Sequence, residues 1–238
     1  MSARRPSPAL VFLLPPALAA GAAVGWWLYK RWGYPVRENE REVAHVEAPP
    51  EAEGPGLQHA EGGAGPRFHR RYSVRVRRAE WSPEQLIADI GADFGPYVAP
   101  ELAQFERETG DGGRLSPGDE FIVHINGPWD GPVRVVESEP ARFVLATREG
   151  HMEAGQIEFR AEPLPPTGGA SGADGLLFTI ESWARSRDEL VDVAYDDLGV
   201  AKGAQQAMWT FFCEQVAKRA GGEIEGEVEV LTEREAAP

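Results

Sequence analysis

The sequence predicts an α+β fold in which a curved antiparallel sheet wraps around one long C-terminal helix. Short segments that alternate apolar and polar residues follow one another between residues 120 and 185, with Gly- and Pro-rich turns between them. Such spacing is typical of antiparallel hairpins. A long apolar stripe of helical period comes next. An amphipathic helix needs a surface for its apolar face, and these strands supply one.

The first 34 residues predict a transmembrane helix that anchors the chain. Residues 9–29 carry no charge and, at about 1.5 Å per residue, can cross a hydrocarbon core of ~30 Å. Trp26, Trp27 and Tyr29 gather at one end, where a bilayer interface favours aromatic rings. A cleaved signal peptide, cut after residues 17–19, is the alternative. The Lys and Arg residues after the span favour a single-pass protein with a cytoplasmic body, and an extracytoplasmic body stays open.

Two acidic segments flank the predicted folded domain, which spans residues 67–222. Residues 35–66 are rich in Glu, Pro, Gly and Ala and have no sustained apolar period. This composition predicts a disordered linker. Residues 223–238 place Glu at nearly every second position, which predicts a solvated acidic tail, with a short edge strand as the alternative.

The folded domain is expected to begin with a strand and two short helices. Residues 68–77 alternate apolar residues with Arg and Ser, which predicts a half-buried strand. Ser82 and Gln85 have the spacing of a capping box around a helix that ends at residues 95–96. Residues 100–110 predict a second short helix. The two helices would close one end of the sheet.

Five further strands and the long helix complete the domain. The helix opens with Asp196 and Asp197, which suit a helix N-terminus, and closes at Gly221 and Gly222. The strands are expected over residues 120–126, 132–137, 141–148, 153–161 and 176–185. The helical stripe consists of Ala201, Ala204, Met208, Phe211, Phe212 and Val216.

This order of elements resembles the helix-grip proteins, the START-like superfamily that includes plant pollen allergens, lipid-transfer START domains and polyketide cyclases. Residues 150–159, Gly-His-Met-Glu-Ala-Gly-Gln-Ile-Glu-Phe, are similar to the Gly-His-Pro-Glu-x-Gly-Glu segment of an uncharacterised family in that superfamily. Met152 here replaces the proline and Gln156 the second glutamate. The resemblance implies that the inner sheet face and the long helix hold an apolar ligand. It implies no particular reaction.

Period-two phasing identifies the side chains that would face such a ligand. Almost all of them are apolar, which suits a lipid or another hydrophobic small molecule. The same residues would also fill the interior if no cavity is present. The candidate ligand-binding residues are Phe121, Val123, Val135, Phe143, Leu145, Ile157, Phe159, Phe178, Ile180, Met208 and Phe212.

An enzyme of the cyclase or dehydratase type is the first alternative. Its candidate catalytic residues are His151 and Glu153, which lie close together at a turn, with Tyr195. His151 can equally be a turn residue with a local hydrogen bond. No metal site is expected, because zinc needs three or four ligands. No cofactor-binding motif is present either.

The net charge argues against a nucleic-acid partner, and the cysteine count excludes an internal disulfide. A net charge of −14 repels nucleic-acid phosphates, so no nucleic acid is expected as a partner. The single cysteine, Cys213, forms no internal disulfide and is expected to be buried and inert. The sequence therefore predicts a membrane-tethered domain that binds a hydrophobic small molecule or lipid. The remaining alternative is a membrane-associated interaction module with a filled core.

Overall fold

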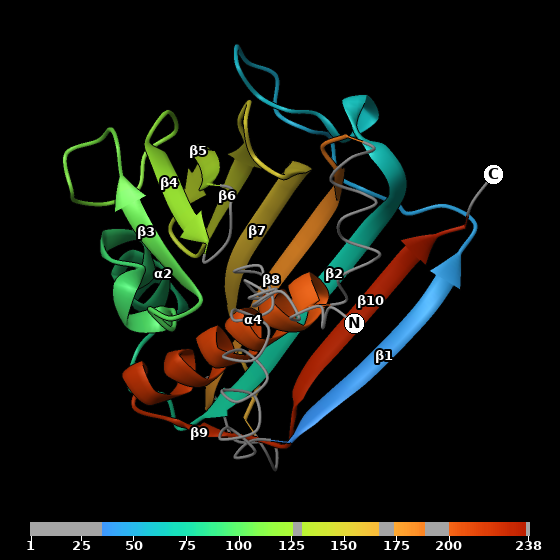
Figure 1. Ribbon diagram of the computed structural model, residues 1–238. Helices are drawn as coiled ribbons and strands as arrows, with labels where there is room; N and C mark the ends of the chain where they lie inside the picture. The colour runs from blue at the N-terminus through green and yellow to red at the C-terminus, as the bar shows by residue number, and fades with distance from the viewer. Residues whose placement is uncertain (1–34, 126–129, 167–173, 189–199, 237–238) are drawn as a thin grey trace, which may run out of the picture.

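The computed structural model describes residues 35–125, 130–166, 174–188 and 200–236. Within these ranges one curved sheet of ten strands carries two α-helices against it (Figure 1). The strand order is β1-β10-β2-β8-β7-β6-β5-β4-β3, and β9 pairs with β2. Each described strand pair is antiparallel except β1 with β10. The predicted α+β class with a curved sheet is confirmed, but the sheet is mixed and not purely antiparallel, because β1 pairs parallel to β10.

The elements have the following bounds. The helices are α2 (Pro83–Ala92) and α4 (Val200–Arg219), and the 3-10 turns are η1 (Ala60–Gly62) and η2 (Gly95–Tyr97). The strands are β1 (Val36–Val43), β2 (Ala64–Arg77), β3 (Ala103–Arg107), β4 (Glu120–Ile125), β5 (Asp130–Glu139), β6 (Arg142–Thr147), β7 (Glu153–Pro163), β8 (Gly175–Ser186), β9 (Glu223–Ile224) and β10 (Val228–Glu235).

The strands from β4 to β8 form the meander that the alternating pattern predicts. Neighbouring strands pair in register, so Phe143 lies opposite Phe159, and Phe159 lies opposite Ile180. Apolar residues therefore form rows across one face of the sheet, and this face builds the core.

Helix α4 covers this face next to β2 and β8 (Figure 1). The helix residues Phe212, Cys213 and Val216 face the sheet and are fully buried. Burial raises the pKa of the Cys213 thiol. The helix ends as predicted. Gly221 has a φ of 69°, and the N–H of Gly222 donates to the carbonyl of residue 217 at 3.1 Å, which is the Schellman arrangement. The predicted start at residues 196–197 lies outside the described residues.

Helix α2 begins as predicted, and it packs against β6 and β7. The Ser82 side chain accepts from the Gln85 N–H, and the Gln85 side chain accepts from the Ser82 N–H at 2.8 Å, which completes the capping box. The second short helix, predicted over residues 100–110, is wrong. Strand β3 occupies this segment, because Phe105 pairs opposite Val123 on β4 and extends the core face by one strand.

The predicted disordered linker and solvated tail are also corrected. Residues 36–43 and 228–235 pair with each other as β1 and β10, and β10 joins the main sheet at β2. Ion pairs across the strands, such as Arg37 with Glu227 at 2.8 Å, balance charges that look repulsive in the sequence. Between β1 and β2 the chain buries Val46 and Ala60 completely. Long-range pairing therefore orders both segments.

The predicted membrane anchor, residues 1–34, lies outside the described residues. Among the helices that the structure does describe, none is long and apolar enough to cross a bilayer.

Candidate functional site

The candidate ligand-binding residues all face the interior, as the phasing predicts. Nine of the eleven belong to the buried core, and Ile157 and Met208 are half-buried against it. Whether they contact a ligand stays a prediction. In the structure they pack against one another and against further core residues such as Phe94, Tyr97 and Trp209.

Aromatic rings fill the centre of this core. The Phe159 ring stacks on Phe143 at a centroid distance of 4.7 Å, and it meets Phe212 at 5.6 Å and Trp209 at 5.7 Å. Phe94 meets Phe159 from the side of α2 at 6.2 Å. These are the spacings of packed aromatic pairs. The sheet and α4 are therefore in direct contact through side chains around Phe159.

A hollow of about 290 Å³ opens at the edge of this core, between α2 and the hairpin that joins β5 to β6. Its lining includes the buried side chains of Ile87, Leu115 and Phe143. The Ser138 hydroxyl donates to the Leu115 carbonyl at 2.8 Å, which ties the loop before β4 to β5. Phe143 is the one predicted ligand-binding residue that lines the hollow. The other face of its ring belongs to the stack with Phe159.

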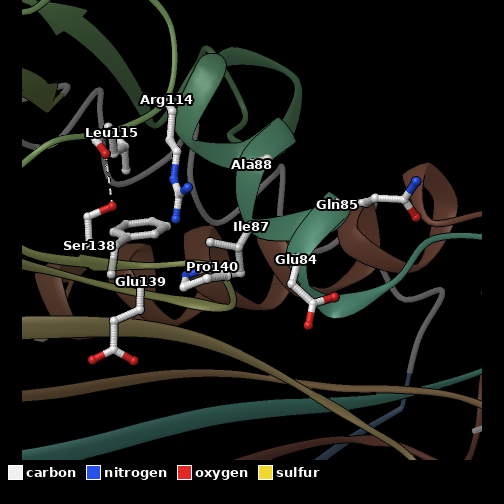
Figure 2. A pocket seen from close by; sticks show the side chains of 10 residues that line it. Glu84, Gln85, Ile87, Ala88, Arg114, Leu115, Ser138, Glu139 and Pro140 are labelled. Carbon is white, nitrogen blue, oxygen red and sulfur yellow. Dashed lines mark hydrogen bonds between the residues drawn. The ribbon is translucent and has the colours of Figure 1, made fainter.

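Charged side chains surround the opening. Figure 2 shows the Arg114 guanidinium reaching down between Ser138 and Ile87, whereas the carboxylates of Glu84 and Glu139 point away from it. Arg114 is exposed and has no ion-pair partner among the described residues. The site thus combines an apolar floor with the Arg114 guanidinium above it and two carboxylates, those of Glu84 and Glu139, that point away. It lies where α2, the loop before β4 and the β5–β6 hairpin converge.

The structure does not bring His151 and Glu153 together as an acid–base pair. The His151 ring is buried, and its Nδ1 accepts from the Glu153 backbone N–H at 2.9 Å. Burial lowers the pKa of His151, so the ring is neutral. The Glu153 carboxylate turns to Arg70 and Gln205 instead. Tyr195 lies outside the described residues. The geometry favours the local hydrogen bond of a turn histidine.

Glycine in the segment 150–159 also has a structural role. Gly155 has a φ of 148°, and a Cβ there would lie 2.1 Å from the Trp183 carbonyl oxygen on β8. Only glycine permits such close approach of two strands. Gly155, which the segment shares with the Gly-His-Pro-Glu-x-Gly-Glu pattern, is therefore needed for the pairing of β7 with β8.

Sequence reasoning missed a buried polar cluster on the inner face. Arg70 on β2, with 6% of its side chain exposed, lies 3.4 Å from the Glu153 carboxylate, and Gln205 on α4 lies 3.4 Å from the other oxygen. The sequence could have predicted this position, because Arg70 lies two residues from the inward-facing Tyr72 on the same strand and therefore faces the same side of the sheet. The inner face therefore carries charge near the end of α4 that begins at Val200.

A second titratable cluster lies on the outer face. His69 on β2 is held between Glu181 on β8 and Glu233 on β10, each at 2.7 Å, and its ring stacks on Trp183. Burial lowers the pKa of His69, but hydrogen bonds to the two carboxylates outweigh it, so the pKa is raised. This cluster links the three adjacent strands β10, β2 and β8 through charged hydrogen bonds.

Comparisons with known proteins show likeness in structure only. No family model matches the chain, and no curated protein matches it by sequence. A hypothetical protein from Helicobacter pylori is similar with a TM-score of 0.43 and 11% identity, over 63% of this chain and 86% of that one. A Thermobifida fusca protein has a TM-score of 0.41 and 12% identity, over 63% and 93% of the two chains.

The solved structures also include an enzyme. Norcoclaurine synthase from Thalictrum flavum, in complex with dopamine and hydroxybenzaldehyde, has a TM-score of 0.41 and 10% identity, over 68% of this chain and 96% of that one. At these values the likeness concerns structure alone and extends to no activity or ligand.

Proposed function

We propose that this chain is a helix-grip domain that binds a compact apolar molecule with an anionic end. The hollow between α2 and the β5–β6 hairpin carries the proposal. Its floor offers aliphatic and aromatic surface, and its volume of about 290 Å³ is at the lower end of small-molecule sites. Arg114 supplies a positive charge above that floor.

The placement of charge explains why an acid is preferred to a neutral ligand. The Arg114 guanidinium has no carboxylate partner among the described residues, whereas Glu84 and Glu139 point away from the opening. A carboxylate or sulfonate above Ile87 and Phe143 would pair with the guanidinium while its apolar body covers the floor. The ligand class is therefore a small aromatic or aliphatic acid.

Filling the hollow tests this proposal. Ala88 lines the opening on the exposed side of α2, so Ala88→Phe should occupy the hollow and leave the buried side of the helix unchanged. We expect binding of the fluorescent dye 1-anilinonaphthalene-8-sulfonate to fall about tenfold or more. Ala92→Phe is the matched control, because Ala92 is also exposed on α2 and does not line the hollow. Equal binding by wild type and both variants would refute the site.

A second comparison tests the anionic end. 1-Naphthoate and 1-naphthalenemethanol have the same ring system and differ in charge, and each can compete with the dye. Arg114→Gln should weaken competition by the acid and leave the alcohol unchanged. If no acid binds the wild type and the folded core stays intact, the interaction module with a filled core becomes the better account.

The predicted anchor is part of the same proposal. Residues 9–29 would hold the domain at a bilayer, from which apolar acids partition. Fractionation with protease protection tests the tether and the side of the membrane. N-terminal sequencing of the mature protein separates an anchor from a cleaved signal peptide.

A further inference from the structure

The structure has a second concave site, on the face of the sheet turned away from α4. We propose that this arginine trough, whose lining includes Arg71, Ser73, Arg75, Arg160 and Thr179, binds a phosphate group. It has a volume of about 520 Å³. The inference is independent of the hollow beside α2, because the two sites share no lining residue.

Two hydroxyl groups form the floor of the trough. Ser73 on β2 lies directly opposite Thr179 on β8 in the antiparallel register. Thr179 is only 3% exposed. Neither hydroxyl has a hydrogen-bond partner among the described residues. Two neighbouring donors without a protein acceptor are suited to the oxygen atoms of one bound anion.

Three guanidinium groups surround this floor. Arg71 and Arg75 lie two residues before and after Ser73 on β2, so their side chains leave the same face of the strand. Arg160 pairs opposite Thr179 on β7. Guanidinium groups bind phosphate through paired charged hydrogen bonds. The register therefore places three such groups around one pair of hydroxyls.

These three arginines differ in how many carboxylates already pair with them. Arg160 is the most compensated, with ion pairs to Glu158 at 2.7 Å, to Glu162 at 3.5 Å and to Glu181 at 3.9 Å, although its buried Nε makes no hydrogen bond in the part of the chain described. Arg71 and Arg75 are exposed and have no carboxylate within ion-pair distance among the described residues. Unused donors thus remain on all three side chains.

The charge around the trough has the opposite sign to the charge of the protein. Five arginines line it, against the three glutamates Glu225, Glu227 and Glu229, whereas the whole chain carries −14. Three of these arginines are already paired with glutamates: Arg37 at 2.8 Å, Arg77 at 3.0 Å and Arg160 at 2.7 Å. The unpaired positive charge therefore comes from Arg71 and Arg75, which flank the Ser73 hydroxyl.

Titration of the full chain with inorganic phosphate tests the proposal, measured by isothermal calorimetry at low ionic strength. The double variant Arg71→Gln, Arg75→Gln should weaken binding about tenfold. Ser73→Ala should also weaken it, although the net charge is unchanged. Lys218→Gln is the control, because it removes one exposed positive charge from α4 on the other face. No binding by wild type, or equal binding by the double variant and the control, would overturn the proposal.

A second titration identifies the source of the phosphate group. Dihexanoyl phosphatidic acid, kept below the concentration at which it forms micelles, presents the same group on a lipid. Tighter binding of this lipid than of inorganic phosphate, with the same loss in the double variant, supports a headgroup site. Tighter binding of inorganic phosphate supports a site for a free anion.

Discussion

Replacing Phe212 with alanine tests whether packed side chains, and not a bound ligand, hold α4 on the sheet. Phe212 is fully buried. Its ring stacks on Phe178 at 5.7 Å and on Tyr97 at 5.0 Å, and it contacts Phe159 at 5.6 Å. The substitution would remove contacts to β8, β7 and η2 at the same time.

The expected cost follows from these contacts. Removing a buried phenyl group costs about 3–5 kcal/mol, depending on how far the surroundings collapse into the cavity. Because rings surround Phe212 on several sides, and aromatic pairs add about 0.5–1.5 kcal/mol each, we expect about 4–5 kcal/mol for Phe212→Ala. Phe212→Leu keeps most of the volume and should cost about 1–2 kcal/mol.

Urea unfolding followed by tryptophan fluorescence measures both values, with the denaturant dependence expected to stay unchanged. Phe211→Ala is the control on the same helix, because Phe211 is half-buried against the small cluster of Ala99, Leu102 and Ala207. A cost below about 1.5 kcal/mol for Phe212→Ala, together with loss of dye binding, would refute the reasoning. Phe212 would then line an open ligand cavity.

Three further predictions concern the titratable clusters. In the folded protein the pKa of His69 is raised and the pKa values of Glu181 and Glu233 are lowered. The contribution of His69 to folding stability is therefore complete below about pH 6.5 and is lost as the pH rises through the folded pKa of His69. It also falls in acid, where the two glutamates become protonated. His69→Gln should therefore cost more at pH 5.5 than at pH 8.5 in urea unfolding. The pKa of His151 is lowered, so wild type should lose stability below about pH 6.5, and His151→Gln should lose less over the same range. Glu153→Ala leaves the Arg70 guanidinium buried without a carboxylate partner and should cost about 3–5 kcal/mol. Adding Arg70→Met should recover most of this loss, whereas no recovery would contradict the pairing.

The local sequence pattern was sufficient to predict the elements that have one buried face and one exposed face. The strands from β4 to β8 alternate because one face builds the core, and the capping box of α2 is a local hydrogen-bond pattern. The inward phase of the apolar residues could be predicted for the same reason. Pattern failed for β3, where the three-residue spacing of Leu102 and Phe105 resembled a helix.

The polar strands could not be predicted because their stabilisation is not local. Strand β1 is exposed along most of its length, and its partner β10 lies nearly two hundred residues away. Glu and Arg along both strands suggest disorder until they are placed side by side, where Arg41 and Glu233 form an ion pair. The alternation of residues along β2 could by itself have predicted that Arg70 faces the core. The partners that make its burial tolerable, Glu153 and Gln205, come from distant elements.

The position of β1 connects the predicted anchor with the arginine trough. β1 begins at Val36, and Arg37 lines the trough. If residues 9–29 cross a bilayer, only six residues separate the end of that span from β1. An extended chain of this length reaches about 20 Å, so the tether would keep the trough close to the lipid headgroups. Anionic headgroups would then meet the arginine trough, whose lining has five arginines and three glutamates. Anchoring and phosphate binding are separate hypotheses, and Arg37 on the edge strand β1 is the residue through which the sheet would connect them.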